Sequence, residues 1–525
     1  MTASATADNE MQDEVFAFLA DPARHGEVRR IDTHAAAVFL AGDRALKVKR
    51  AVRFSYLDYS TLAKRKAACE DELRISRPFA PQIYRRVVPI TASADGSLTI
   101  DGQGTPVEYA VEMTRFDERQ TLDHLAEAAA PDPDLVAAAA DAIAASHVTA
   151  PLAAATPWID SIPPIIADNS AAFRAVGCFP HQEINRLDEA SRAAFSEVRA
   201  LLARRGEQGF VRRCHGDLHL ANVVLIEGKP VLFDAIEFDP LIASVDVLYD
   251  LAFPMMDYLH YGRRAAANGL LNRYLGATSD DHIDALAALP LFMSLRAAIR
   301  AKVLLARLGR TADAKATAVK EEAGRYFELA QRLIDPSPPV LVAVAGLSGT
   351  GKSVAARALA PDIMPEPGAV VLRTDVLRKQ LFKVREEDRL PESAYRPEVT
   401  ERVYEMVVKR AERILLQGHS VIVDGVFARE SERSKINDVG KRLNIRQVGL
   451  FLVADLAIRT SRIDGRTNDA SDATPAIAER QQTYDLGTMD WKAIDASGTA
   501  EQTLQRCRAC VGIDPKPAEA RALCS

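Results

Sequence analysis

The sequence predicts a two-lobed α+β domain followed by an α/β domain with a parallel sheet. Strand-like segments dominate residues 28–116, and helical patterns dominate from about residue 120 to residue 334. Strands and helices alternate after residue 339. Between the two regions stands DPSPP, residues 335–339, whose three prolines separate a periodic helix from an apolar strand. Such clusters of helix breakers mark a linker.

Strands come first in the N-terminal region. They are AAAVFLAG, RALKVKR, YRRVVPIT, SLTIDG and VEYAVEMTRF, with one helix at about 61–77. Mostly helical sequence follows, and this order is typical of an α+β unit with two lobes. We expect the first domain to occupy residues 1–334, with an N-lobe at about 25–116 and a C-lobe at about 120–334.

The C-terminal region alternates instead. The apolar runs VLVAVA, AVVLRT, SVIVDG and QVGLFLVA are separated by helical stretches. Short apolar strands between helices indicate a parallel sheet that is covered on both faces. We expect this second domain to occupy residues 340–512 and a loose tail to occupy residues 513–525.

Composition is that of a globular protein with an ample core. The chain has 525 residues, of which 48% are hydrophobic and 26% are charged, and its net charge is −6. The mild charge gives no electrostatic footprint for nucleic acid. No run approaches the roughly 18 apolar residues that span a membrane. The polar, acidic N-terminus does not resemble a secretory signal.

The six cysteines are scattered along the chain, which favours a reduced, cytoplasmic protein over a disulfide framework. Cys507 and Cys510 form a single CxxC, and Cys524 follows it. A zinc site usually needs two such pairs, so we interpret this one as an incidental pair on a helix.

GLSGTGKS, residues 346–353, fits G-x-x-x-x-G-K-[ST] and lies between a predicted strand and a predicted helix. Glycines let backbone N–H groups curl around phosphates, and the helix N-terminus favours negative charge. The lysine reaches the β- and γ-phosphates of ATP, and the final serine reaches Mg²⁺. The predicted nucleotide contacts are Gly346, Ser348, Gly349, Thr350, Gly351, Lys352 and Ser353.

Two features near AVVLRTDVLRKQL favour a kinase over a nucleotide switch. Asp375 stands at the C-terminal end of a strand, and Arg378 lies one helical turn further on. Phosphoryl transfer to an alcohol needs a carboxylate that takes the hydroxyl proton and a cation that orients the acceptor. The alternative is that Asp375 is only a helix N-cap.

Two further segments complete the predicted site. SVIVDG ends a strand with Asp424, which we expect to join Ser353 in the Mg²⁺ shell. The polar stretch RTSRIDGRTNDASDAT carries Arg459, Arg462 and Arg466. Arginines on a mobile lid stabilise the charge of a transferring phosphoryl group, so we take Arg462 and Arg466 as catalytic candidates. A solvated helix face is the alternative.

The combination of GLSGTGKS, TDVLRK and the arginine stretch resembles the small P-loop kinases related to gluconate kinase, zeta toxin and the 5′-kinase domain of polynucleotide kinases. The resemblance covers about residues 338–500. It implies ATP and Mg²⁺ as cofactors. It does not name the phosphate acceptor, which differs among these relatives.

A second chemical motif, CHGDLHLANVVL, occupies residues 214–225 and runs into a predicted strand. Asp217 and Asn222 lie five apart on a loop before a strand, one placed to accept a hydroxyl proton and the other to ligate Mg²⁺. PVLFDAIEFD then places Asp234 at the end of the next strand as a second metal ligand. The spacing matches a kinase catalytic loop and its metal-binding aspartate. Two hairpin strands with polar turns are the structural alternative.

This region resembles the aminoglycoside phosphotransferase and choline kinase branch of the protein-kinase-like fold. The resemblance implies that Asp217 is the catalytic base, that Asn222 and Asp234 hold Mg²⁺, and that Asp250 is structural. It also implies a strand lysine, Lys47 or its competitor Lys49, that grips the ATP phosphates.

The same resemblance implies that Glu72, with Glu70 as runner-up, is the ion-pair partner of that lysine, and that backbone at residues 113–116 meets adenine. The segment expected to cover the nucleotide, at about residues 33–43, has no GxGxxG, which disfavours protein kinase activity. Taken whole, the chain resembles bacterial fusions of such a domain with a P-loop kinase domain.

The leading hypothesis is a bifunctional cytoplasmic phosphotransferase that moves the γ-phosphoryl of ATP to hydroxyl groups of small molecules at two sites. The C-lobe helices at about 254–330 are rich in Arg and Lys, which favours an anionic or neutral acceptor. The alternatives are a regulator in which ATP gates domain contacts without turnover, and a toxin-like kinase with an attached regulatory domain.

Overall fold

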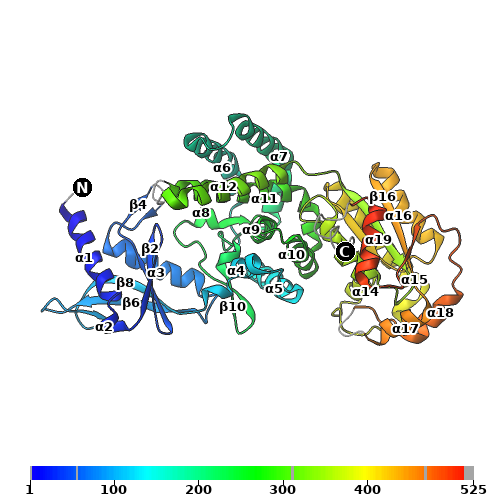
Figure 1. Cartoon of the computed structure of the whole chain (residues 1–525), viewed down its shortest axis with the longest axis horizontal. Coiled ribbons are helices and arrows are strands. Elements are labelled where there is room, and N and C mark those ends of the chain that lie inside the picture. The colour runs from blue at the N-terminus through cyan, green and yellow to red at the C-terminus, as the bar shows by residue number, and fades with distance from the viewer. Residues whose placement is uncertain (1–2, 55–56, 309–312, 466–469, 514–525) are drawn as a thin grey trace. The chain divides into compact units, whose positions relative to one another are not determined.

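The computed structural model describes residues 3–54, 57–308, 313–465 and 470–513 (Figure 1). The chain folds into two compact units. Unit 1 comprises Met1–Ala175 and Phe195–Tyr261, and unit 2 comprises Val176–Ala194 and Gly262–Ser525.

Unit 1 begins with an antiparallel sheet of six strands in the order β1-β2-β3-β8-β6-β7. The strands are β1 (Val28–Asp32), β2 (Ala36–Ala41), β3 (Arg44–Lys49), β6 (Tyr84–Ala92), β7 (Leu98–Ile100) and β8 (Thr105–Thr114). A small hairpin of β4 (Arg53–Phe54) and β5 (Leu57–Asp58) stands beside it. Two helices, α1 (Ala3–Leu19) and α2 (Pro22–His25), precede the sheet.

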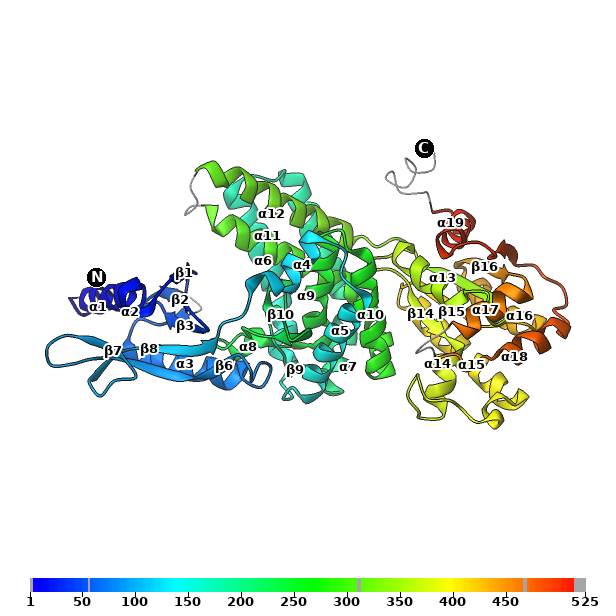
Figure 2. The ribbon, with the colours of Figure 1, turned by 60° about the horizontal axis from the view of Figure 1, so that its bottom comes forward.

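Alternation along β3 decides which of its side chains face helix α3 on the other side of the sheet. Leu46 and Val48 pack with Phe16 of α1 on one face of the sheet. Lys47 and Lys49 point to the opposite face, because successive strand residues alternate. That face is covered by α3 (Leu62–Ser76), which runs along β6 and β8 (Figure 2). The helix agrees with the one predicted at 61–77, and Thr61 caps it by accepting from Lys64 N.

The rest of unit 1 is mostly helical, as predicted. Its elements are η1 (Glu118–Gln120), α4 (Leu122–Ala128), α5 (Pro133–Thr149), α6 (Ala155–Val176), β9 (Val211–Arg213), η2 (Leu220–Asn222), β10 (Val223–Ile226), β11 (Lys229–Leu232), α8 (Pro240–Ala243), β12 (Ser244–Asp246) and α9 (Val247–His260). Helix α7 (His181–Glu207) runs from unit 2 into unit 1. β10 and β11 form an antiparallel hairpin, and β12 pairs with β9 in a second antiparallel sheet of two strands.

Unit 2 starts with a group of helices: α10 (Arg264–Ala277), η3 (Asp280–Ala288), α11 (Leu289–Ala306) and α12 (Asp313–Ile334). These helices form the last part of the helical region predicted up to residue 334. Ser294 of α11 donates to the Ala330 carbonyl of α12 at 2.8 Å, which joins these two helices.

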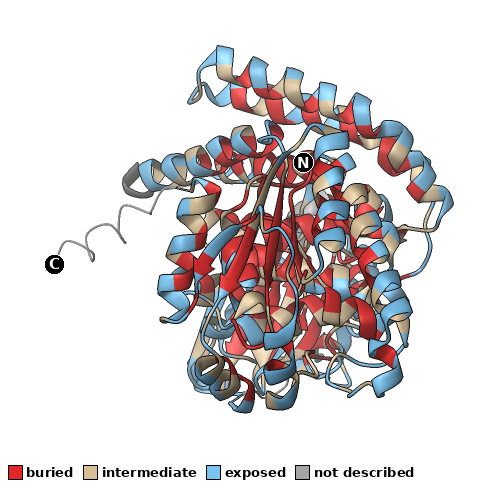
Figure 3. Cartoon of the chain, turned by 90° about the vertical axis from the view of Figure 1, so that its right-hand side faces the viewer, coloured by how far each residue is buried: buried red, intermediate tan, exposed pale blue. Residues whose placement is uncertain are grey.

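A five-stranded parallel sheet follows in the order β14-β15-β13-β16-β17, which confirms the predicted α/β fold. The strands are β13 (Val340–Gly346), β14 (Val370–Arg373), β15 (Val421–Asp424), β16 (Arg446–Val453) and β17 (Lys492–Asp495). The central strands are buried between helices (Figure 3). Those helices are α13 (Lys352–Leu359), α14 (Thr374–Leu381), α15 (Pro397–Leu416), α16 (Glu430–Leu443), α17 (Leu456–Asp464), α18 (Pro475–Arg480) and α19 (Ala500–Val511), with short turns η5 (Ala360–Asp362), η6 (Glu392–Tyr395) and η7 (Gln481–Thr483).

The predicted linker, residues 335–339, connects α12 to β13 without helix or strand. It lies inside unit 2, whereas the compact units divide at residue 261. The domain boundary at 335–339 therefore stays a prediction. The predicted tail lies almost wholly outside the described residues, which end at 513. None of the described helices has the length and apolar character that crossing a membrane requires.

Candidate active sites

The hairpin of β10 and β11 brings the two predicted metal ligands of unit 1 together. Val223 pairs with Leu232, so the residues just outside the ladder face each other. Phe233 N donates to the Asn222 carbonyl at 3.0 Å, and Asp234 follows directly. Asn222 and Asp234 thus stand together at the open end of one hairpin, although they belong to two separate sequence motifs.

Asp217 is tied to this end by the Asn222 amide. Asn222 Nδ2 donates to the Asp217 carbonyl at 2.8 Å and approaches its Oδ2 at 3.4 Å. The Asp217 side chain is 43% exposed, and the Asp234 side chain is equally open at 43%. Two accessible carboxylates and one amide therefore lie at or beside the open end of this hairpin.

A buried aspartate holds the loop that carries Asp217. Asp250 accepts from His215 N at 3.3 Å and from Gly216 N at 2.9 Å. His215 Nε2 bonds the Phe233 carbonyl at 2.8 Å, which connects the loop to the strand before Asp234. Burial lowers the pKa of His215, so its ring is neutral. The ring therefore supports the loop through its hydrogen bond to the Phe233 carbonyl and not through a charge.

Lys47 and Lys49, the two candidates for the phosphate-binding lysine, make different contacts in the structure. Lys47 Nζ lies 2.9 Å from Glu72 Oε1 and 2.6 Å from Asp234 Oδ1. Lys49 is buried and bonds the other oxygen of Glu72. Lys47 is therefore the lysine that contacts Asp234 at the open end of the hairpin. Glu70, the runner-up to Glu72, is exposed and faces Lys66 instead.

Both lysines fix the charge of Glu72. Burial acts to raise the pKa of this carboxyl, but the charges of Lys47 and Lys49 outweigh it and lower the pKa to about 2. Burial lowers the pKa of Lys47, yet the carboxylates of Asp234 and Glu72 hold it well above its usual value. Glu72 and Lys47 are thus both charged at neutral pH.

Sequence reasoning missed Glu237, three residues after Asp234. Lys49 Nζ bonds Glu237 Oε1 at 2.5 Å, and Tyr59 OH donates to the same oxygen at 3.2 Å. Glu237 therefore clamps the segment after Asp234 to the sheet through a second lysine. The signal available in the sequence was the KxK spacing of β3, which places both lysines on one face.

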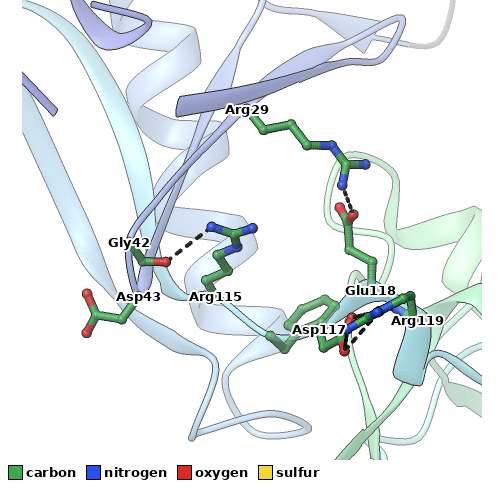
Figure 4. A pocket seen from close by; sticks show the side chains of 8 residues that line it. Arg29, Gly42, Asp43, Arg115, Asp117, Glu118 and Arg119 are labelled. Carbon is green, nitrogen blue, oxygen red and sulfur yellow. Dashed lines mark hydrogen bonds and ion pairs between the residues drawn. The ribbon is translucent and has the colours of Figure 1, made fainter. Parts of the chain in front are cut away.

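The segment after β8, predicted to meet adenine, lines a cavity of about 540 Å³. Arg29 of β1 and the β2–β3 turn form its other wall. Figure 4 shows Arg29 reaching across to Glu118, 2.7 Å away, and Arg115 Nη1 donating to the Gly42 carbonyl at 3.3 Å. The ion pair between Arg29 of β1 and Glu118 of η1 thus spans this cavity.

The second site begins at the glycine loop of unit 2, which leads from β13 into α13. Gly346, Gly349 and Gly351 have φ of 139°, 86° and 88°, values that side chains rarely tolerate. A Cβ at Gly349 would lie 2.4 Å from the Arg459 carbonyl oxygen, so close packing also requires glycine there. Lys352 Nζ donates to the Leu347 carbonyl at 3.2 Å, within the loop.

Parallel strand ends assemble the predicted Mg²⁺ ligands of this site. Strands β14, β15 and β13 are neighbours, so their carboxyl ends meet at one edge. Ser353 Oγ donates to Asp424 Oδ2 at 2.5 Å, and Arg373 Nε lies 3.4 Å from the same oxygen. The structure therefore brings Ser353 and Asp424 together as predicted.

Asp375 faces two adjoining cavities. One, of about 380 Å³, lies over the glycine loop, and the other, of about 550 Å³, extends beyond Asp375 and Arg378. Burial raises the pKa of Asp375, and the charge of Asp424 adds to this effect. The N-cap alternative is wrong, because α14 begins at Thr374 with Arg373 as its cap residue.

Arg378 lines the larger cavity from the same helix. Its Nη1 donates to the Ala394 carbonyl at 2.6 Å, and its guanidinium stacks over the Tyr395 ring. Its buried Nε has no hydrogen-bond partner among the described residues. The cavity thus presents a carboxylate and a guanidinium one helical turn apart.

The predicted lid arginines act differently from one another. Arg459 is buried and donates from Nε to the Ser348 carbonyl at 2.8 Å, so it braces the glycine loop. Arg462 lines the cavity over that loop, but its two Nη atoms donate to the carbonyls of Ala496 and Gly498. Arg466 lies outside the described residues.

Another missed residue, Asp472, joins the lid segment to the acceptor side. Its carboxylate lies 3.0 Å from Lys379 Nζ, accepts from Leu390 N at 3.1 Å and accepts from Tyr395 OH at 2.5 Å. Its signal was weak, because one acid among several in a polar stretch has no distinctive spacing.

Two segments of the chain match models of known families. Residues 38–289 match the phosphotransferase enzyme family, and residues 341–485 match a family described as an AAA domain. These matches identify an enzyme of the kinase type in which a phosphotransferase domain precedes a nucleotide-binding P-loop domain. They confirm the predicted pair of folds and their order.

Relatives span nearly the whole chain. Uncharacterized proteins of Mycobacterium tuberculosis and Mycobacterium bovis are 28% identical over 487 residues, which is 90% of this chain and 93% of theirs. Each half also has solved neighbours. A choline/ethanolamine kinase family protein from Mesorhizobium loti is 15% identical over 62% of this chain and 99% of its own, with a TM-score of 0.32. A gluconokinase from Sinorhizobium meliloti is 19% identical over 33% of this chain and 92% of its own, with a TM-score of 0.24.

Proposed function

We propose that the chain is a bifunctional ATP-dependent phosphotransferase, with two independent sites that each move the γ-phosphoryl of ATP to a hydroxyl group of a small molecule. The observation that carries the proposal is the duplication of a complete site. Each one combines a lysine for the phosphates, oxygen ligands for Mg²⁺ and a separate carboxylate for the acceptor proton.

In the first site, Asp217 is the general base, and Lys47, oriented by Glu72, binds the ATP phosphates. Asn222 and Asp234 would hold Mg²⁺. This fits the chemistry of the ion, which prefers carboxylate and amide oxygens. Asn222 donates through Nδ2 to Asp217, which turns its Oδ1 away from that bond. When bound, Mg²⁺ would neutralise charge on the β- and γ-phosphates.

In the second site, Asp375 is the base and Arg378 orients the acceptor in the larger cavity. The glycine loop and Lys352 bind the phosphates, and Ser353 and Asp424 would hold Mg²⁺. The hydroxyl and carboxylate oxygens of this pair are the donor types that the ion prefers. Arg462 and Arg466 remain proposed stabilisers of the transferred phosphoryl group.

The acceptors we propose are small hydroxylated molecules, anionic or neutral. The Arg- and Lys-rich helices of the C-lobe support this, since a polycation such as an aminoglycoside would need acidic groups. The mild net charge argues against nucleic acid, and the scattered cysteines support a cytoplasmic location.

The test is a screen of metabolites and antibiotics with γ-labelled ATP, run on the wild-type chain and on Asp217→Asn and Asp375→Asn. We expect one set of labelled products to disappear in the first variant and a different set in the second. If both sets persist in both variants, or if no acceptor is labelled while ATP binds, the nucleotide-gated regulator replaces the phosphotransferase.

A further inference from the structure

The helix α10 contacts the P-loop domain through side chains that bond its backbone. Asn272 Oδ1 accepts from Val371 N at 2.7 Å, and Asn272 Nδ2 donates to the Ala369 carbonyl at 3.1 Å. Asn268 Nδ2 donates to the same carbonyl at 3.0 Å. Figure 2 shows α10 beside β14, and both belong to unit 2.

The bonded backbone belongs to the edge strand of the parallel sheet. Strand β14 pairs with β15 on one side, where Val370 N donates to the Ser420 carbonyl at 2.9 Å. Its other side has no strand neighbour in the sheet order. An edge strand leaves N–H and C=O groups unpaired. The Asn272 amide supplies one donor and one acceptor to this edge, as a further strand would.

The contact is close and charged around this amide. Gly368 has a φ of 115°, and a Cβ there would lie 2.8 Å from Asn268 Nδ2. Glu366 is buried, and its two oxygens pair with Arg264 of α10 at 2.9 Å and Arg332 of α12 at 3.2 Å. The segment before β14 is therefore packed too tightly on the helix group to slide along it.

A second set of ion pairs joins η3 to α15. Arg410 lies 2.7 Å from Asp280, and Arg413 lies 2.8 Å from Asp284. Helix α15 packs on β14 and β15. The helix group thus contacts both the edge strand and the helix that packs on it.

The edge strand leads directly to the acceptor side of the P-loop site. Two residues after Val371, Arg373 lies beside Asp424. Two residues further, Asp375 faces both cavities. A four-residue strand cannot shift at Val371 without moving Asp375, because extended backbone transmits displacement along its axis.

We propose that Asn272, in the region matched to the phosphotransferase family, is a positioning residue for phosphoryl transfer at the P-loop site. It holds β14 in register and thereby places Asp375. The proposal rests on the proposed role of Asp375 as base. It implies that the second activity depends on a helix outside the P-loop match, residues 341–485.

The test compares Asn272→Leu with Gly276→Ala in the full chain, both carrying Lys47→Ala so that nucleotide binding reports on the P-loop site. Gly276 is on the same helix, and a Cβ there meets nothing within 4 Å. Asp375→Asn calibrates the assay. The readouts are ATP affinity, turnover of Mg·ATP with water as acceptor, melting temperature, and hydrogen exchange of the amides of residues 370–375.

We expect Asn272→Leu to lower turnover by about tenfold to 10²-fold, since small misplacements of catalytic groups have effects of this size. ATP affinity should stay within about twofold of the control, because the glycine loop is not touched. Exchange at Val371 should become faster. The control should match the parent in every readout.

Two results overturn the positioning role alone. One is unchanged turnover in Asn272→Leu while Asp375→Asn is strongly impaired. The other is a parallel fall of turnover, ATP affinity and melting temperature, which would make the contact purely structural. Unchanged turnover in Asp375→Asn overturns the proposed base as well, and so separates failure of the proposed function from failure of the inference.

Discussion

The two candidate sites are assembled in opposite ways. In unit 1, charged side chains from distant segments hold one another: Lys47 and Lys49 share Glu72, and each continues to an acid near the hairpin end. In unit 2, the course of the backbone positions the site: glycines with positive φ shape the loop, and the ends of neighbouring strands bring Ser353 and Asp424 together.

The difference also separates the basic residues of the two sites. The lysines of unit 1 act as point charges, whereas the guanidinium groups of Arg459 and Arg462 donate hydrogen bonds to backbone carbonyls. Loss of charge should therefore damage the first site most. In the second site, added side-chain bulk should be as harmful as lost charge.

Asp217→Asn is the change with the largest expected effect. Asparagine keeps the size and hydrogen bonding of the base but cannot take the acceptor proton, and general-base catalysis contributes about 10²–10⁴-fold. ATP affinity, which depends on Lys47 and the metal ligands, should stay near normal. Calorimetry and turnover with an acceptor from the screen measure the two quantities.

Asp234→Asn is the matched comparison, because it should also weaken Mg·ATP binding. Wild-type turnover in Asp217→Asn would remove the phosphotransferase assignment from the first site.

Lys352→Ala should abolish tight nucleotide binding in the second site and leave the first intact. Removing one partner of a buried charge pair costs about 2–5 kcal/mol, so the Kd should rise about 30-fold or more. Titration of Lys352→Ala alone measures the first site, and titration of Lys352→Ala on a Lys47→Ala background isolates the second. An equal loss at both sites would show that the sites are coupled or that the boundary between them is misplaced.

Gly349→Ala tests the backbone-built site through bulk alone. The Cβ would lie 2.4 Å from the Arg459 carbonyl oxygen, and overpacking of this kind costs about 1–3 kcal/mol beyond the strain of a positive φ. Gly418→Ala is the control, with a φ of 72° and nothing within 4 Å of its Cβ. Denaturant unfolding of both variants measures the excess. Equal destabilisation would mean that close packing of the loop on Arg459 contributes nothing.

Glu237→Gln should have the smallest effect and probes the second ion pair of unit 1. Glutamine keeps a hydrogen bond to Lys49 but loses its charge assistance, a difference of about 1 kcal/mol. Turnover at the first site should fall several-fold at low Mg²⁺ and recover at high Mg²⁺, because the segment after Asp234 loosens. Tyr59→Phe, which removes the weaker contact to Glu237, is the control. A loss that Mg²⁺ does not rescue would assign Glu237 a purely structural role.

The two sites also differed in how far the sequence predicted them. The glycine loop, Asp375 and Asp424 could be predicted because each stands at the end of a strand that consecutive residues reveal. Glu72 was predicted through a family resemblance, and the different contacts of Lys47 and Lys49 could be seen only in the structure.

Glu237, Asp472 and Asn272 could not be predicted, since each acts on a partner about 80 residues or more away and none belongs to a spaced motif. Helix α1 was also missed, because most of its first ten residues are small or polar and its large buried side chains, such as Val15 and Phe16, come near its end.

The central claim is that one chain holds two independent ATP sites, and nucleotide stoichiometry tests it most directly. Calorimetry with Mg²⁺ and a non-hydrolysable ATP analogue should give two molecules bound per wild-type chain. Lys47→Ala and Lys352→Ala should each bind one, and the double variant should bind none. A stoichiometry of one in the wild-type chain, abolished by either substitution, would contradict the account, because the two lysines would then serve a single shared site.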